Sequence, residues 1–242
     1  MYSLITVNGS GHGGHGDALH VSDFNLSDTD LEVFMVHENK PLNAGIEMHN
    51  AESGEYVFGV PTTKDIGRGA AADIIASSEG AEAWADGTIY ASDGKVLVYK
   101  APAANFVIWW DADLGREILD HSNYTPAVYK WSETANSAKL AFSMIGCSTN
   151  NSTKANPGLQ ADLFGDWREE VAVRTSDSSA VRIYTNTEVC DYRIYTLMND
   201  TQYRCAIAWQ TTGYNQPPHP SFYIGYDKDL IEIPVKNYKL AE

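Results

Sequence analysis

Side chains suited to binding and proton transfer gather in one stretch of the sequence, Cys147 to Glu170 (CSTNNSTKANPGLQADLFGDWREE). Its first half has no hydrophobic periodicity and carries amides, hydroxyls and an ammonium group, at Asn150, Asn151, Ser152, Thr153, Lys154 and Asn156. Its second half is strand-like and acidic. Amides and hydroxyls hydrogen-bond to sugars, and carboxylates bind hard cations. We therefore interpret the stretch as a sugar- and cation-handling loop on a β scaffold.

A histidine-rich tract near the start, GHGGHGDALH at 11–20, is a candidate metal site that includes His15 and Asp17. His-rich tracts bind metals, and the glycines allow close approach of the backbone to a ligand. Calcium normally takes oxygen ligands, so histidine would be an unusual partner for it. The alternative is a flexible loop with incidental histidines.

Acidic residues recur in a repeated unit, in which a strand ends in Asp, a polar turn follows, and the next strand begins with an acid. The candidates for cation binding are Asp23 with Glu32, Asp73 with Glu82, and Asp162 with Asp166 and Glu169. None has the spacing of an EF-hand loop. Turn capping and solvation explain the same pattern, and spacing alone does not decide between the two.

Two further loops carry groups suited to an acidic sugar. Arg68 lies between Gly67 and Gly69, which leaves its guanidinium unobstructed for a bidentate contact with a carboxylate; a surface arginine in a tight turn is the alternative. The loop YNQPPH at 214–219 is rigid and rich in aromatic and amide groups, which suits a carbohydrate rim.

The composition limits the class of protein. The chain has 242 residues, 43% of them hydrophobic, and no run approaches the roughly 18 consecutive apolar residues of a membrane span. The net charge of −15 argues against a nucleic-acid partner and suits bound cations. The three cysteines lack C-x-x-C spacing, so no zinc site and at most one disulfide are expected. The N-terminus does not have the pattern of a signal peptide.

Strand signals run through the whole chain, and helix signals are scarce. Strands are expected as far as Arg193–Leu197, Arg204–Trp209 and Ser221–Gly225. The repeat of about 40–50 residues with about four strands per unit is typical of a β-propeller. We expect an all-β fold in which 1–242 form one propeller domain, an incomplete ring of about four to five blades, with 1–10 as an irregular segment. An open ring exposes apolar blade faces, which predicts self-association.

The motifs strongly resemble the rhamnogalacturonan lyases of polysaccharide lyase family 11. The resemblance runs from about Gly11 to Gly225 and rests on GHGDALHVSD, LEVFMVHE, DIGRGAAADI, NFVIWWDADLGRE, CSTNNSTKANPGLQADLFGDWREE, RIYTLMND and AIAWQTTGYNQPPHPSF. It implies a secreted or periplasmic enzyme with an eight-bladed propeller and several calcium ions, which cleaves the rhamnogalacturonan-I backbone of pectin by β-elimination at galacturonate. Members are more than twice as long, so the chain resembles only the C-terminal part of their catalytic propeller. Ser152 stands where the family usually has glycine.

The resemblance implies roles for individual residues. Lys154 would be the base, its pKa lowered by neighbouring cations, and Arg68 would hold the substrate carboxylate. The substrate-binding set would be Asn151, Ser152, Thr153, Thr211, Gly213, Tyr214 and Asn215. The calcium ligands would be His15, Asp17, Asp23, Glu32, Asp73, Glu82, Asp162, Asp166 and Glu169.

Three functions follow from these patterns. The first is a lyase that completes its ring as a homo-oligomer and acts on pectin oligosaccharides. The second is a truncated propeller that binds pectin without turnover. The third is a structural fragment that assembles through its exposed edges. None of the three involves a membrane or a nucleic acid.

Overall fold

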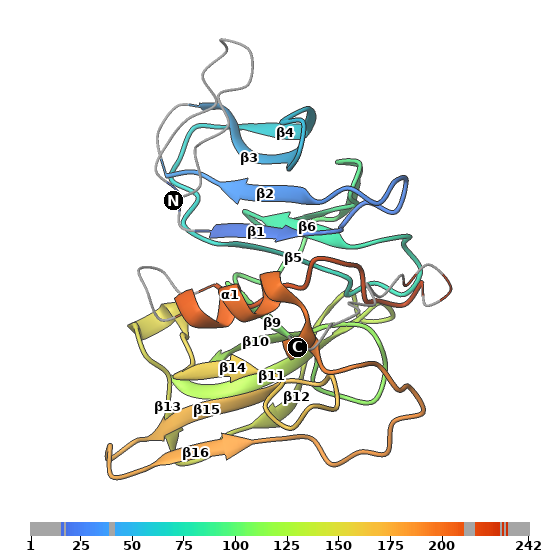
Figure 1. Ribbon diagram of the computed structural model, residues 1–242. Coiled ribbons are helices and arrows are strands. Elements are labelled where there is room, and N and C mark those ends of the chain that lie inside the picture. The colour runs from blue at the N-terminus through green and yellow to red at the C-terminus, as the bar shows by residue number, and fades with distance from the viewer. Residues whose placement is uncertain are drawn as a thin grey trace.

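The computed structural model describes Gly16, 18–38, 42–210, 216–227, Asp229 and Ile231, without the side chains of 42–44. The described residues form four antiparallel sheets of four strands each, with one α-helix near the C-terminal end (Figure 1). No helix in this part of the chain is long and apolar enough to cross a membrane. The all-β prediction is confirmed at this level.

In the first three sheets the strands lie side by side in chain order. The first sheet contains β1 (Ala18–Ser22), β2 (Glu32–Val36), β3 (Leu42–Asn50) and β4 (Tyr56–Thr62). The second contains β5 (Gly69–Ala72), β6 (Glu82–Ala85), β7 (Thr88–Tyr90) and β8 (Val96–Val98). The third contains β9 (Phe106–Ile108), β10 (Glu117–Ser122), β11 (Thr125–Ser132) and β12 (Ser137–Ser143).

The fourth sheet is built around one central strand, because β15 (Glu170–Thr175) pairs with each of the other three. These are β13 (Cys147–Ser148), β14 (Leu159–Ala161) and β16 (Val181–Tyr184). The remaining elements are the short 3-10 turns η1 (Ser152–Lys154) and η2 (Leu197–Asn199) and the helix α1 (Thr201–Trp209).

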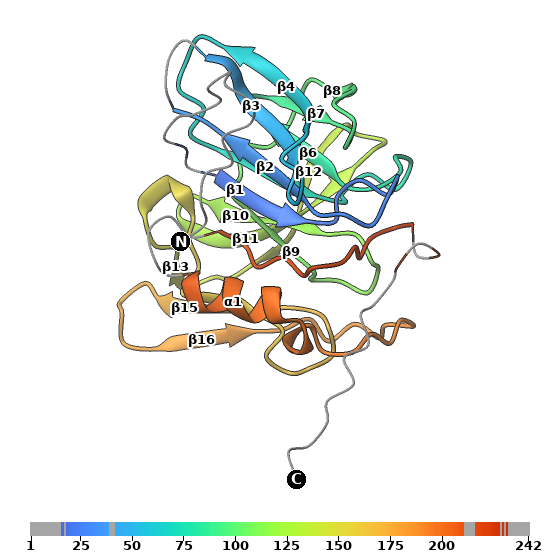
Figure 2. The same cartoon turned by 45° about the horizontal axis from the view of Figure 1, so that its top comes forward.

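The four sheets stack face to face in chain order, with the first and the fourth at opposite ends of the molecule (Figures 1 and 2). Alternating residues of a strand point to opposite faces. Thus Ala71 and Ala83 pack toward the first sheet, whereas Ala70 and Trp84 pack toward the third. Between the third and fourth sheets, Leu119 meets the apolar side chains of β15. Each inner sheet therefore buries both faces.

In every sheet, a glutamate that begins a strand fixes the turn before that strand, which is the second strand in the first three sheets and β15, the third in chain order, in the fourth. One carboxylate oxygen accepts hydrogen bonds from two consecutive backbone N–H groups that follow the preceding strand. The donors are Phe24 and Asn25 for Glu32, Ile74 and Ile75 for Glu82, Trp110 and Asp111 for Glu117, and Leu163 and Phe164 for Glu170. The predicted acidic repeat is thus a structural unit. Its member in the fourth sheet is Glu170 and not Glu169, and in the third sheet Trp109 replaces the aspartate.

The segment 216–227 connects the last part of the chain to the first strand. The Ser22 hydroxyl donates to the Pro220 carbonyl (2.7 Å), and His20 lies 2.9 Å from His219. The Gln202 amide, from α1, donates to the Val21 carbonyl (2.9 Å). These contacts close a path from the fourth sheet back to the first.

A buried ion pair between Arg116 and Glu169 stabilises the position of the segment 216–227. Arg116 donates to His219 (3.0 Å) and forms an ion pair with Glu169 (3.1 Å), and its guanidinium lies 3.8 Å from the centroid of the Trp109 ring. Glu169 also accepts hydrogen bonds from the Tyr203 hydroxyl (2.7 Å) and the Gln160 amide (2.8 Å). Both charges are buried, so the pair depends on these additional hydrogen bonds.

The three strand predictions that follow β16 are wrong. Arg204–Trp209 belongs to α1, because Asp200 caps that helix through a hydrogen bond from the Tyr203 N–H (2.9 Å). Arg193–Leu197 and Ser221–Gly225 contain no strand, and Leu197 is the first residue of η2. The strands β10 and β13 were not predicted. The predicted segment 1–10 lies outside the described residues.

Candidate active site

Two segments far apart in the sequence make reciprocal contacts. The Lys154 ammonium donates to the Gly67 carbonyl (2.6 Å). In return, the Arg68 guanidinium donates to the Thr153 hydroxyl (2.6 Å) and to the Ala103 carbonyl (3.1 Å). The two candidate catalytic cations, predicted from separate motifs, therefore lie together. Arg68 keeps further N–H groups for a ligand, since each terminal nitrogen carries two hydrogens.

The loop that carries Lys154 owes its shape to left-handed backbone conformations. Asn151, Ser152 and Ala155 have φ angles of 52°, 52° and 58°, and Asn150 pairs with Asn156 across the base of the loop. Asparagine tolerates this conformation, and glycine adopts it more readily than serine. The result is a short turn that exposes Asn151, Ser152 and Thr153.

These groups lie at one end of the sheets, here called the Arg68 end. Arg68 directly precedes β5, Ala103 precedes β9, and the Lys154 loop precedes β14, so the starts of these three strands, from three neighbouring sheets, meet there. Asp120, near the end of β10, is at the same end. Burial raises the pKa of Asp120, and the nearby Arg68 guanidinium acts in the opposite direction. The Arg68 end thus combines two cations, amides and hydroxyls.

A buried cluster that the sequence analysis did not single out lies beside this region. His37 contacts one oxygen of Glu47 (2.5 Å), and His49 contacts the other (3.1 Å). Burial raises the pKa of Glu47, but hydrogen bonds from the two histidines outweigh it and lower that pKa to about 2. The His37 carbonyl accepts the Ile66 N–H (3.1 Å), two residues before Arg68. The alternation of polar residues in IEMH at 46–49 was the available signal.

Among the acidic candidates, Asp73 and Glu82 have the strongest cation-site character. Both side chains are buried, and Oδ1 of Asp73 and Oε1 of Glu82 have no hydrogen-bond partner among the described atoms. Burial raises the pKa of Asp73 to about 7, and burial together with the Asp73 charge raises that of Glu82 well above its usual value. Burial also raises the pKa of Glu32 to about 7.

The other acidic candidates take part in protein contacts. Asp162 accepts from the Gly165 N–H (2.7 Å) and, through its second oxygen, from the Leu197 N–H (2.8 Å). Asp166 pairs with Arg168 (2.7 Å), and Glu169 pairs with Arg116. Asp23 is half-buried. A metal role for these four residues stays a prediction.

Three further acids, Asp111, Asp113 and Glu117, bring ligand atoms within 4.8 Å of one another, the spacing of a cation site. The Lys130 ammonium lies among them. It contacts Asp111, Asp113 (2.7 Å) and Glu117 (2.9 Å). Within the described structure, a lysine therefore supplies the positive charge at this cluster.

Six predicted residues lie outside the part of the chain that the structure describes. They are His15, Asp17, Thr211, Gly213, Tyr214 and Asn215.

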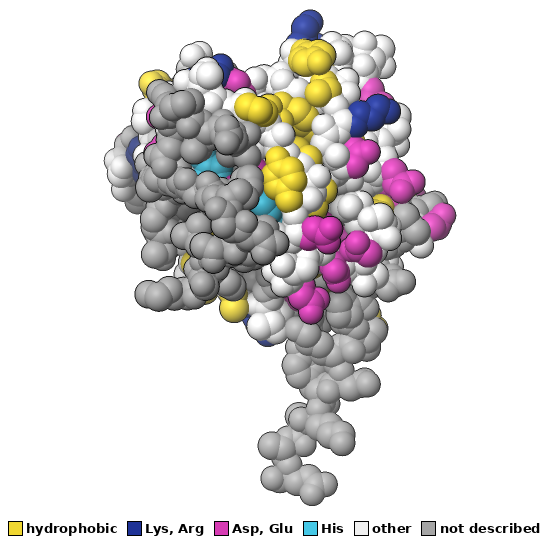
Figure 3. All heavy atoms as spheres, turned by 90° about the horizontal axis from the view of Figure 1, so that it is seen from above, with side chains coloured by type: hydrophobic (Ala, Val, Ile, Leu, Met, Phe, Trp, Pro, Cys, Tyr) yellow, Lys and Arg dark blue, Asp and Glu magenta, His cyan; other side chains and the backbone are white. Residues whose placement is uncertain are grey.

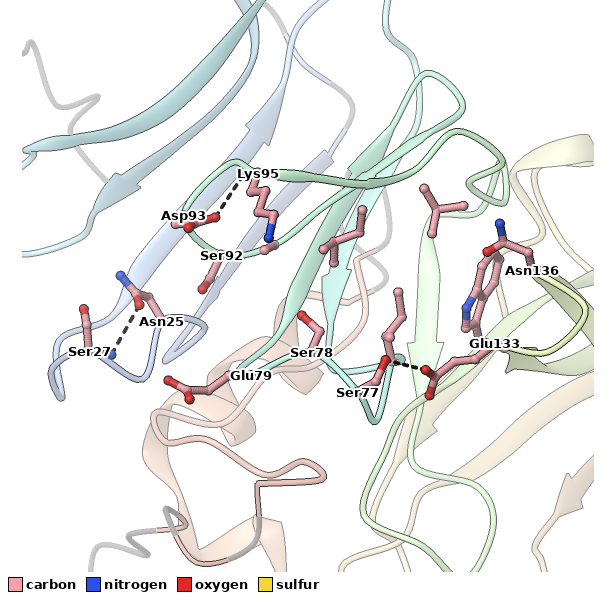
Figure 4. Close-up of a pocket in the computed structure, with 15 residues that line it drawn as sticks. Asn25, Ser27, Ser77, Ser78, Glu79, Ser92, Asp93, Lys95, Glu133 and Asn136 are labelled. Carbon is pink, nitrogen blue, oxygen red and sulfur yellow. Dashed lines mark hydrogen bonds between the residues drawn. The ribbon is translucent and has the colours of Figure 1, made fainter.

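A pocket of about 720 Å³ lies at the opposite end of the first three sheets (Figure 4). It is lined by residues that follow β5, such as Ser77, and by the acids Glu79, Asp93 and Glu133, with Lys95 as a cation. The Ser77 hydroxyl donates to Glu133. Since acids predominate, this pocket suits an anionic polysaccharide less well than the Arg68 end. Acidic side chains also gather on the face seen in Figure 3.

The sheets and the polar face define an all-β chain of repeated four-stranded units. The family model described as "Rhamnogalacturonan lyase family 11, C-terminal domain" matches residues 5–234. The chain belongs to this family, as its motifs predicted.

Two curated relatives come from Bacillus subtilis (strain 168). Rhamnogalacturonan exolyase YesX is 47% identical over 245 residues, which cover 93% of this chain and 40% of YesX. Rhamnogalacturonan endolyase YesW is 49% identical over 213 residues, which cover 88% of this chain and 34% of YesW. This chain thus spans 40% or less of the length of either relative.

Solved structures show the same relationship. The Bacillus licheniformis rhamnogalacturonan lyase PL11 superposes with a TM-score of 0.85 at 48% identity, over 91% of this chain and 37% of that chain. The structure of YesX gives a TM-score of 0.86 at 47% identity, over 92% of this chain and 39% of that chain.

Proposed function

We propose that this chain forms one side of the active site of a rhamnogalacturonan lyase, which cleaves the backbone of pectin by β-elimination at galacturonate. The observation that carries the proposal is the reciprocal contact of Gly67 and Arg68 with Thr153 and Lys154. It brings a carboxylate-binding guanidinium beside a basic amine, and relatives that match this chain are rhamnogalacturonan lyases.

β-Elimination removes the C5 proton of galacturonate, breaks the C4–O4 bond and forms a double bond between C4 and C5. O4 leaves with the attached sugar and takes up a proton from solvent. The electron pair left at C5 is delocalised toward the sugar carboxylate, so positive charge at that carboxylate stabilises the transition state. Arg68 binds the carboxylate, and Lys154 is the base that accepts the C5 proton. Asn151, Ser152 and Thr153, together with Thr211, Gly213, Tyr214 and Asn215, bind hydroxyls and orient the ring.

Calcium is part of the proposal. Calcium takes carboxylate oxygens, and the unpartnered buried oxygens of Asp73 and Glu82 fit that preference. A bound cation would offset the cost of burying two negative charges. Asp23, Glu32, Asp162, Asp166, Glu169, His15 and Asp17 are proposed to hold further ions. When bound, calcium supplies positive charge that stabilises carboxylates.

The four sheets are proposed to be consecutive blades of a propeller that continues beyond the first sheet. Leu19, Val21, Val33 and Met35 alternate with the core residues of β1 and β2 and lie half-buried on the face of that sheet turned away from the second sheet. Another sheet packing there would bury them. Further blades, or a second copy of this chain in a homo-oligomer, would supply that sheet. The proposed location is extracellular or periplasmic.

Binding without turnover is the second candidate, favoured by one observation. This chain covers 40% and 34% of its two curated relatives. The opposite wall of a pectin cleft would come from outside the matched part.

The test is the release of unsaturated product from rhamnogalacturonan I, followed by ultraviolet absorbance. Lys154→Met and Arg68→Lys should each lower the rate by roughly 10²–10⁴-fold, since each removes a transition-state interaction. Lys64→Met is the matched control, because Lys64 is exposed and pairs with Asp86 (2.7 Å). Product formation that survives Lys154→Met would refute the catalytic assignment. Oligosaccharide binding without any product from the wild type would favour the second candidate.

A further inference from the structure

The turn between β10 and β11 holds an aromatic residue in a backbone conformation that suits glycine. Asn123 and Tyr124 have φ angles of 49° and 66°. The corresponding turn between β6 and β7 has Asp86 and Gly87, at 49° and 77°. A two-residue hairpin loop of this kind prefers glycine in its second position. A tyrosine there is strained, and strained residues concentrate at functional sites.

The strained turn presents a stacked pair of rings. The His121 and Tyr124 rings are 5.4 Å apart and nearly parallel, with an interplanar angle of 4°. The Tyr124 N–H donates to His121 Nδ1 (3.1 Å), which fixes the position of the imidazole. Tyr124 is nevertheless 54% exposed. Since His121 covers one face of its ring, the other face is open to a ligand.

This aromatic pair adjoins the Arg68 end. The Tyr124 carbonyl accepts the Thr149 N–H (3.2 Å), at the start of the loop that carries Lys154. Asp120, which precedes His121, lies within electrostatic reach of Arg68. The pair and the candidate catalytic groups thus belong to one continuous surface at the same end of the sheets.

We propose that Tyr124, backed by His121, is a sugar-binding subsite that stacks on a neutral pyranose residue neighbouring the uronate held by Arg68. An aromatic face carries negative charge density and attracts the weakly positive C–H face of a sugar ring. An uncharged residue is specified because the Asp120 carboxylate would repel a second uronate. The subsite rests on the proposed function above.

The test measures oligosaccharide binding by calorimetry in a Lys154→Met background, which prevents turnover. Tyr124→Gly should weaken binding by about tenfold or more, the usual effect of losing one aromatic stack, whereas Tyr124→Trp should retain it. The melting temperature of Tyr124→Gly should be unchanged or higher, since glycine relieves the strain. A lower affinity for the oligosaccharide without a lower melting temperature distinguishes a binding residue from a structural one.

Tyr195→Ala is the control, because Tyr195 is 67% exposed and precedes Thr196, which contacts Asp162 at the other end of the fourth sheet. In the Lys154→Met background, Tyr195→Ala should bind the oligosaccharide with unchanged affinity. Parental affinity in Tyr124→Gly, or a lower melting temperature in that variant, would overturn the subsite alone. If the parent binds no rhamnogalacturonan oligosaccharide, the proposed function fails together with the subsite.

Discussion

At acidic pH, protonation of His20 should weaken the contacts that join the segment 216–227 to β1. Arg116 can only donate hydrogen bonds, so His219 must accept one at Nδ1 (3.0 Å) and donate another from Nε2 to His20 Nδ1 (2.9 Å). His20 then donates from Nε2 to the Gly69 carbonyl (3.0 Å). The chain of hydrogen bonds is satisfied only when both histidines are neutral. A proton added to either ring would place two donors against each other.

The size of the effect follows from the pKa. Burial lowers the pKa of His20 from 6.5 to about 4, despite its hydrogen bond to Gly69. Between these values the unfolded chain binds more protons than the folded chain, so stability is complete above pH 6.5 and is lost as the pH falls toward 4. Through His20 alone, the unfolding free energy should be lower by about 2 kcal/mol at pH 5 and by about 3 kcal/mol at pH 4 than above pH 6.5.

The assay is urea unfolding of the wild type and His20→Gln between pH 4 and pH 7.5. Glutamine keeps one donor and one acceptor but does not titrate. The difference in unfolding free energy between the two proteins should favour the wild type at pH 7.5 and shrink by about 2 kcal/mol at pH 5. Titrating groups away from this chain of hydrogen bonds, such as Glu47, are common to both proteins and cancel in the difference. Parallel stability curves over this range would refute the proposed protonation states.

Two further substitutions test the structural role of the acidic repeat. Lys130→Met leaves three carboxylates without their shared ammonium. It should cost about 1–2 kcal/mol, because the group is partly exposed. Added calcium should raise the melting temperature of this variant more than that of the wild type. Equal increases would contradict the conclusion that Lys130 supplies the positive charge at these three carboxylates. Glu170→Ala should cost about 2–4 kcal/mol in urea unfolding, since it removes the acceptor for the N–H groups of Leu163 and Phe164. Glu170→Gln should cost less, and equal costs would show that the carboxylate oxygen is not the acceptor that matters.

The repeat of four-stranded units could be predicted from the sequence because each unit is local. Strands within a sheet are joined by short turns, and the alternation of apolar residues marks their faces. β10 was missed because its sequence, EILDHS, is half polar, although its first three residues are buried. The helix α1 was read as a strand because the local alternation in RCAIAW resembles one, and the cap at Asp200 was overlooked.

The pairing of Arg68 with Lys154 was expected only through family resemblance. Their contacts join positions 85 or more residues apart, and no local pattern encodes such a distance. The same reason explains why Arg116, Glu169 and His219 were not predicted to form one network. Glu169 was grouped with the acidic repeat because it adjoins Glu170, and only the register of β15 separates their roles.

The contact between His20 and His219 spans 199 positions of the chain. Closing a loop of that length costs about 5 kcal/mol in chain entropy, beyond the constant for any closure. At a synthesis rate of about 5–20 residues per second, His219 is synthesised on the order of 10–40 s after His20. During that interval the polar groups of β1 lack their contacts with the C-terminal segment. The first three sheets can form from neighbouring strands during that time. A ribosome halted before His219 would therefore hold sheets that are folded and a first strand whose histidine, serine and backbone groups still face water.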